Sequence, residues 1–123
     1  MSSLEFRKQQ RLLNAHDFKA VFADAPYRAS HQHLLILSRN NGSDTARLGL
    51  VIAKKNIRLA VNRNRVKRLI RESFRHHQQQ LAGLDVIVLA RRGLDELDNA
   101  VLSHTLNKQW RRITRKRDQE KGE

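Results

Sequence analysis

The feature that most constrains this chain is a strongly basic segment, residues 54–75, that also carries a regular apolar stripe. Of its 22 residues, nine are Lys or Arg and one is acidic, so nine minus one gives +8 of the formal net charge of +13. Apolar and small side chains recur there at the i, i+3, i+4, i+7, i+8 spacing of one helix side. They are Val66, Leu69, Ile70, Ser73 and Phe74. The pattern predicts an α-helix that is buried on one side and cationic on the other.

The cationic side of this helix follows from a rotation of about 100° per residue. The residues expected on the outer arc are Asn64, Lys67, Arg68, Arg71 and Arg75, with Arg63 and Arg65 nearer its edges. A packed helix that concentrates positive charge repels itself unless a polyanion supplies a compensating field. A merely solvated face is the weaker interpretation, because Glu72 is the only acid in the segment. The favoured partner is nucleic acid.

The length of 123 residues and the 39% hydrophobic content suit one compact domain and are too small for two. We expect a single domain over 1–123, with an N-terminal arm at 1–13 and a frayed tail at 115–123. The chain has no cysteine, which excludes disulfides and thiolate zinc sites and is typical of a reducing compartment. The six histidines are not arranged with carboxylates as a metal site.

The sequence gives no sign of a membrane partner. No apolar run approaches the roughly 20 residues that span a bilayer, and no secretory signal is visible, so we expect a cytoplasmic protein. An anionic membrane surface would also attract a basic chain, but surface helices need an apolar face that is free to insert. Here that face is needed for packing, which again favours nucleic acid.

Upstream of the basic segment the sequence predicts one helix and two strands. Asn14 can cap a helix, and Pro26 ends it. An apolar strand at 33–38 and an alternating strand at 47–53 flank a run of turn residues, so we expect a hairpin. The second strand has one face of small residues, namely Gly49, Val51 and Ala53.

Downstream, Asn62 is the predicted N-cap of the basic helix, and residues 84–90 form the clearest buried strand. A last helix follows, and Trp110 lies on its apolar stripe and is expected in the core. The order helix, strand, strand, basic helix, strand, helix predicts an α+β fold. We expect an α/β sandwich with helices packed on one small mixed sheet of about four strands.

The segment from Arg63 to Phe74, preceded by the run from Leu48 to Lys55, resembles the signature of the bacterial ribonuclease P protein subunit. A Gly-containing strand, a Lys-Lys pair, the Arg-Asn-Arg centre and a Lys-Arg-x-x-Arg continuation occur together. The resemblance extends over nearly the whole chain. It implies a left-handed crossover between the strands that flank the basic helix, as in the ribosomal protein S5 domain 2-like fold, whereas handedness rules alone favour a right-handed one.

The resemblance also implies a function. Family members join a large catalytic RNA, one protein per RNA, to remove the 5′ leader from precursor tRNA. The RNA and its magnesium ions perform the hydrolysis, so no catalytic residue, metal or cofactor of the protein itself is expected. The protein binds the catalytic RNA and holds the single-stranded leader in a cleft beside the sheet.

The residues that match the family carry suitable chemistry, because guanidinium groups form paired contacts with phosphate and lysine acts as a point charge. The predicted RNA-binding residues are Arg63, Asn64, Arg65, Lys67, Arg68, Arg71, Lys54 and Lys55. Asn64 is as well suited to stabilising the helix start. The predicted leader cleft consists of Phe18, Phe22, Val51 and Ala53. The two aromatic residues also fit a packing role, and both roles are compatible.

Three other kinds of function remain open at this point: a ribosomal-type structural RNA binder, a DNA-binding module and a stand-alone nuclease. The last is disfavoured because the twelve carboxylates are scattered and form no evident two-metal cluster. A group of basic residues near the C-terminus either adds a second phosphate contact or keeps the tail soluble. These are Arg111, Arg112, Arg115, Lys116 and Arg117.

Overall fold

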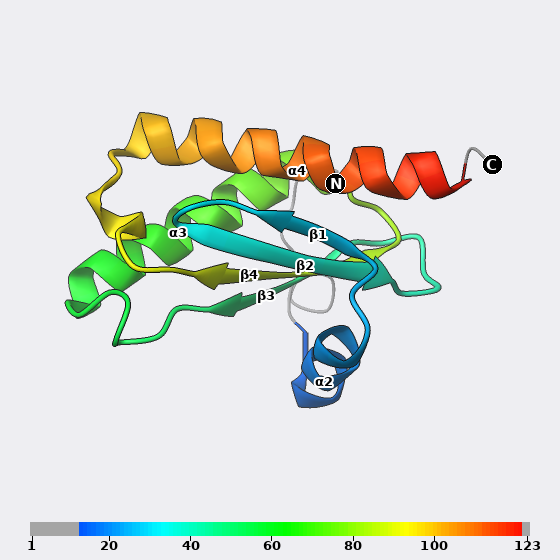
Figure 1. The fold of residues 1–123 in the computed structure, drawn as a ribbon, viewed down its shortest axis with the longest axis horizontal. Helices are drawn as coiled ribbons and strands as arrows, with labels where there is room; N and C mark the ends of the chain where they lie inside the picture. The colour runs from blue at the N-terminus through cyan, green and yellow to red at the C-terminus, as the bar shows by residue number, and fades with distance from the viewer. Residues whose placement is uncertain (1–12, 122–123) are drawn as a thin grey trace, which may run out of the picture.

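The computed structural model describes residues 13–121, so nearly all of the predicted N-terminal arm lies outside the described residues (Figure 1). The fold is α+β, as predicted. Its elements are α2 (Ala15–Ala23), β1 (Tyr27–Ser30), β2 (Leu34–Asn40), β3 (Arg47–Val51), α3 (Ala60–His77), β4 (Leu84–Ala90), the short 3-10 helix η1 (Leu94–Glu96) and α4 (Asn99–Lys121).

The four strands form one mixed sheet in the order β1-β2-β4-β3. β4 lies between β2, to which it is antiparallel, and β3, to which it is parallel. The predicted hairpin between the strands at 33–38 and 47–53 is therefore wrong. Nearly every residue of β4 is buried, so this strand takes a central position where both of its faces are covered. α3 connects the parallel pair β3 and β4, and the left-handed sense of this crossover stays a prediction.

One strand was not predicted. β1 covers only Tyr27–Ser30 and pairs antiparallel with β2. Tyr27 and Ala29 are buried, while Arg28 and Ser30 are exposed. Two inward side chains are too short a pattern to indicate a strand without knowledge of its neighbour.

The helices cover both faces of the sheet (Figure 1): α3 and α4 pack on one face and α2 on the other. Trp110 of α4 is fully buried in the larger core, as predicted. Its Nε1 donates a hydrogen bond of 2.8 Å to the hydroxyl of Ser73 on α3, and its ring meets that of Phe74 at an interplanar angle of 70°. An indole that is buried with its N–H satisfied joins the two helices firmly.

The helix ends differ in part from the predictions. Asn14 caps α2, as predicted, and forms a capping box with Asp17. Asn62 is not the N-cap of the basic helix: α3 begins at Ala60 after Leu59, and the Asn62 side chain donates to a carboxylate oxygen of Asp95 instead. α2 ends at Ala23, ahead of Pro26. Residues 115–121, expected to fray, continue α4 as helix.

Candidate RNA-binding surface

The outward side of α3 is cationic, and its inward side is buried. Val66, Ile70, Ser73 and Phe74 are buried against the sheet and α4. A shallow depression of about 390 Å³ runs along the opposite side and is lined by Asn64, Lys67, Arg68, Arg71 and Glu72. The two-sided helix predicted from the sequence is thus confirmed.

The single acid of this surface is already occupied. Glu72 accepts hydrogen bonds from Arg75 at 2.5 Å and from the ring of His76 at 3.0 Å. The bond from Arg75 is the main reason that the pKa of Glu72 lies below its ordinary value. Among residues 13–121, Lys67 and Arg68 have no acidic partner, and the same holds for Arg71. Three cations are therefore available to a ligand.

Arg63 and Arg65, at the edges of the arc, bind the protein's own main chain. Arg63 donates to the carbonyl oxygens of Ile57 and Arg58 at 2.9 and 2.8 Å. The guanidinium of Arg65 donates to the turn before α4, where its acceptors are Asp95 O, Leu97 O and Asn99 Oδ1. Arg63 thus fixes the loop that leads into α3, and Arg65 joins α3 to the segment before α4. This role does not follow from the spacing of residues in the sequence, and RNA binding by this pair stays a prediction.

Arg65 and Arg68 are expected to differ in their effect on folding. Arg65→Gln removes three hydrogen bonds from a charged donor and should lower the free energy of unfolding by about 1–2 kcal/mol. Arg68→Gln should change it by less than about 0.5 kcal/mol, because Arg68 is exposed. Urea denaturation measures both. Equal stability of the two variants would contradict a structural role for Arg65.

Lys54 and Lys55 are exposed in the loop that joins β3 to α3. Asn56 holds this loop in place, since its side-chain amide donates to the carbonyl of Ala90 at the end of β4 at 2.9 Å. Both lysines therefore lie in a fixed loop between the end of β3 and the start of α3.

Three of the predicted cleft residues, Phe18, Phe22 and Val51, lie on the face of the sheet that carries α2. The rings of Phe18 and Phe22 are stacked with centroids 6.3 Å apart. Phe18 lies on Gly49 of β3, where a Cβ would come within 2.5 Å of the ring. Only glycine allows this contact without displacing the ring. Phe22 is turned outward and is 51% exposed.

Val51 lies on the same face in a row that crosses three strands. It pairs in register with Leu89 of β4, which pairs with Leu35 of β2. All three side chains are only partly buried. Leu35 and Leu89 were missed by the sequence reading, because their face of the sheet depends on the pairing register. Ala53 lies beyond the end of β3 and is also partly buried.

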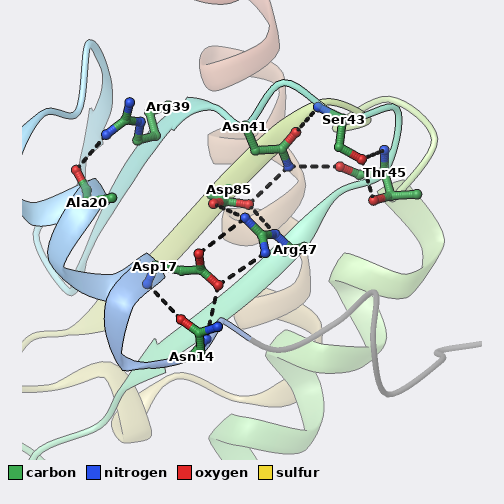
Figure 2. A network of polar contacts seen from close by, with 9 residues as sticks. All are labelled: Asn14, Asp17, Ala20, Arg39, Asn41, Ser43, Thr45, Arg47 and Asp85. Atoms are coloured by element: carbon green, nitrogen blue, oxygen red, sulfur yellow. Dashed lines mark hydrogen bonds and ion pairs between the residues drawn. The ribbon is translucent and has the colours of Figure 1, made fainter.

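An ion-pair network fixes α2 to the sheet (Figure 2). Arg47 of β3 donates through Nε and NH2 to the two carboxylate oxygens of Asp85, each at 2.8 Å. Its NH1 donates to Asp17 in the first turn of α2 at 3.1 Å. The Asn41 side chain donates to Asp85 and to Thr45 O. The bond with Asp85 is the main cause of a raised pKa of Arg47, so this cation stays charged.

The other end of α2 has its own anchor. The NH1 of Arg39 on β2 donates to the carbonyl of Ala20 at 2.9 Å, which satisfies an acceptor near the helix C-terminus (Figure 2). These contacts do not follow from local sequence patterns, because the partners come from α2, β2, β3, β4 and the loop between β2 and β3. An aspartate inside the apolar strand 84–90 was the available signal, since a buried carboxylate needs a cation.

A cationic helix, a lysine-bearing loop and a sheet face edged by phenylalanine together define a class: small α+β proteins with the charge distribution of a nucleic-acid binder. A family model described as Ribonuclease P matches residues 6–114. A ribonuclease P protein component from Pseudomonas aeruginosa is 53% identical over 117 residues, covering 95% of this chain and 87% of that protein. The chain belongs to the ribonuclease P protein family.

Solved structures agree with this assignment. The fold is similar to that of a Staphylococcus aureus RNase P protein mutant with defective mRNA degradation activity, at a TM-score of 0.77 and 28% identity, covering 85% of this chain and 87% of that chain. The RNase P protein from Thermotoga maritima is 31% identical at a TM-score of 0.69, covering 81% and 96% respectively.

No helix within residues 13–121 has the length and apolar character needed to cross a membrane.

Proposed function

We propose that this chain, as a protein component of ribonuclease P, binds a large catalytic RNA and the 5′ leader of precursor tRNA and thereby assists removal of the leader. The observation that carries the proposal is the outward side of α3, where Lys67, Arg68 and Arg71 line one depression without an acidic partner in the described chain. Guanidinium and ammonium groups held rigidly in this way suit a phosphate backbone.

The two faces of the molecule divide the task. α3, with Lys54 and Lys55 beside its start, contacts the catalytic RNA. The face that carries α2 receives the leader, where the exposed ring of Phe22 can stack on a base and the row through Leu89 supplies an apolar floor. Such stacking does not depend on the base sequence of the leader, so one protein can bind the leaders of many different precursors. Hydrolysis is assigned to the RNA and its magnesium ions, with one protein per RNA, in the cytoplasm.

Reconstitution tests the proposal. The protein is added to the catalytic RNA at a magnesium concentration too low for the RNA alone, and release of the 5′ leader is followed on a precursor tRNA. We expect the protein to restore cleavage at the normal site. A ribosomal-type structural RNA binder, the main alternative, would leave the rate unchanged, as would a DNA-binding module.

The leader face is tested by binding of precursor tRNA and mature tRNA to the protein assembled with the catalytic RNA. Phe22→Ala should weaken binding of precursor by about 1–3 kcal/mol, the usual contribution of one stacked base, and leave binding of mature tRNA unaltered. Phe22 is a better probe than Phe18, because Phe18 packs on Gly49 and its replacement would lower the stability of the fold. Val101→Ala on α4, also an exposed apolar residue, is the matched control. Equal losses of affinity for precursor and mature tRNA would show that the leader does not bind this face.

A further inference from the structure

α4 carries a second group of cations that the α3 surface does not explain. Between Asp98 and Asp118 the sequence has no acidic residue and six Lys or Arg. Three of the six have structural partners: Arg112 donates to Ser30 O, Lys116 to Arg28 O, and Arg117 to Ala82 O. The other three are Lys108, Arg111 and Arg115, which we call the α4 basic stripe.

The α4 basic stripe lies on the side of α4 opposite the core. The inward residues of the helix include Leu106, Trp110 and Ile113, all fully buried. Lys108, Arg111 and Arg115 follow one another at i, i+3 and i+7, and all three are exposed. Within residues 13–121 their side chains form no hydrogen bond or ion pair. With Arg112 they line a depression of about 490 Å³.

Solubility does not explain this arrangement well. A helix surface that serves only solubility mixes both charge signs, and like charges three or four residues apart repel each other. The helix dipole favours cations only in the last turn, and Lys108 lies in the middle of α4. The pKa of His31 is lowered mainly by burial, and the neighbouring cations Arg112 and Lys108 contribute in the same direction. A polyanion on this surface would relieve the repulsion.

The stripe is separate from the α3 surface. Arg65 and Ser73 mark the side of α3 that faces α4, through their bonds to the turn before α4 and to Trp110. Lys67 and Arg71 lie on the other flank of α3, and the depressions on the two helices share no lining residue. A single straight stretch of RNA backbone therefore cannot contact both surfaces.

The length of the stripe suits a phosphate row. Lys108 and Arg115 are seven positions apart in the helix, which corresponds to a rise of about 10 Å. A duplex strand places one phosphate per roughly 3.4 Å of axis, so about three phosphates face three cations. The Lys and Arg side chains of the stripe can bind phosphate groups without contacting a base. Phosphate contacts position an RNA without selecting its sequence.

We propose that the α4 basic stripe binds the sugar-phosphate backbone of a second RNA segment, distinct from the segment that α3 holds. This rests on the proposed partnership with a catalytic RNA. The protein then contacts two separated segments of that RNA, and its rigid core fixes the distance between them.

Salt-dependent binding of the full-length protein to the catalytic RNA tests the inference. The variant carries Lys108→Gln, Arg111→Gln and Arg115→Gln, and the control carries Lys108→Arg, Arg111→Lys and Arg115→Lys, which keep the charge. Loss of three phosphate contacts should reduce the slope of log affinity against log salt by about 2–3. Between 50 and 200 mM salt, wild type should then lose about 20–40-fold more affinity than the variant. The control should behave like wild type, and thermal unfolding should be unchanged in both.

Hydroxyl-radical footprinting identifies the segments. We expect the α4 variant to lose protection of one RNA segment while the segment protected by α3 stays protected. An unchanged slope, or loss of the same segment from variants in α3 and α4, would overturn the inference. So would a variant that keeps its RNA affinity but no longer binds vesicles of anionic phospholipid. Wild type that fails to restore leader removal would overturn the proposed function itself, whereas restoration with an unchanged α4 slope would sink only this inference.

Discussion

Replacing Lys67, Arg68 and Arg71 together by glutamine is expected to weaken binding to the catalytic RNA by about 100–500-fold near 0.1 M salt. Each lost phosphate contact contributes about 0.7–0.9 to the logarithmic salt slope, and three contacts sum to about 2–2.7 decades at that concentration. The fold should tolerate the change, because these side chains line an open depression and their helix is held by its opposite side. Filter binding over a salt series measures the effect.

A matched control separates local contacts from net charge. Lys19→Gln, Arg28→Gln and Arg92→Gln also remove three charges, from exposed positions outside α3. This control should lose only a small part of the affinity. If both triple variants weakened binding equally, only the net charge of the protein would matter for binding. The proposed role of the α3 surface would then be wrong.

Arg47→Ala is expected to lower the free energy of unfolding by about 2–4 kcal/mol. The side chain of Asp85 is only 5% exposed, and without Arg47 its one remaining side-chain donor among residues 13–121 is Asn41. A buried carboxylate that loses its cation carries most of its desolvation cost unrelieved. The expected loss of stability is moderate because the Arg47 side chain is 28% exposed, so water can enter the space that it leaves and solvate Asp85. Denaturant unfolding gives the value.

The cause of the Arg47→Ala loss can be checked by a second change. Adding Asp85→Asn removes the unpaired charge and should recover part of the stability. No recovery would show that packing of the arginine stem, rather than charge, carries the effect. Because Arg47 also binds Asp17, the single variant should loosen α2, and binding of precursor should fall more than binding of mature tRNA.

The parts of this structure that local patterns determine could be predicted from the sequence. The two sides of α3 follow from the spacing of Val66, Ile70 and Phe74, and the cap of α2 follows from Asn14. The family signature is also local, because its basic part is the contiguous run from Arg63 to Phe74. Each of these features depends on residues a few positions apart.

What the sequence did not reveal depends on distant partners. The position of β4 between β2 and β3 is a competition among strands for the central place, which no single strand pattern decides. Arg65 was expected to face RNA, yet its long side chain reaches carbonyls about 30 positions away in the chain. The network of Arg47 joins residues that only the finished fold brings together.

The contacts of Arg112 and Lys116 with β1 also bear on how the protein behaves before it meets RNA. β1 is one of the two outer strands of the sheet, and an open outer strand is where identical chains can add to one another and aggregate. The two cations occupy the outward carbonyls of Ser30 and Arg28, and a second chain would have to displace them and approach a positive helix. Protein chains that are not yet bound to RNA should therefore repel each other at the β1 edge, where they would otherwise add to one another.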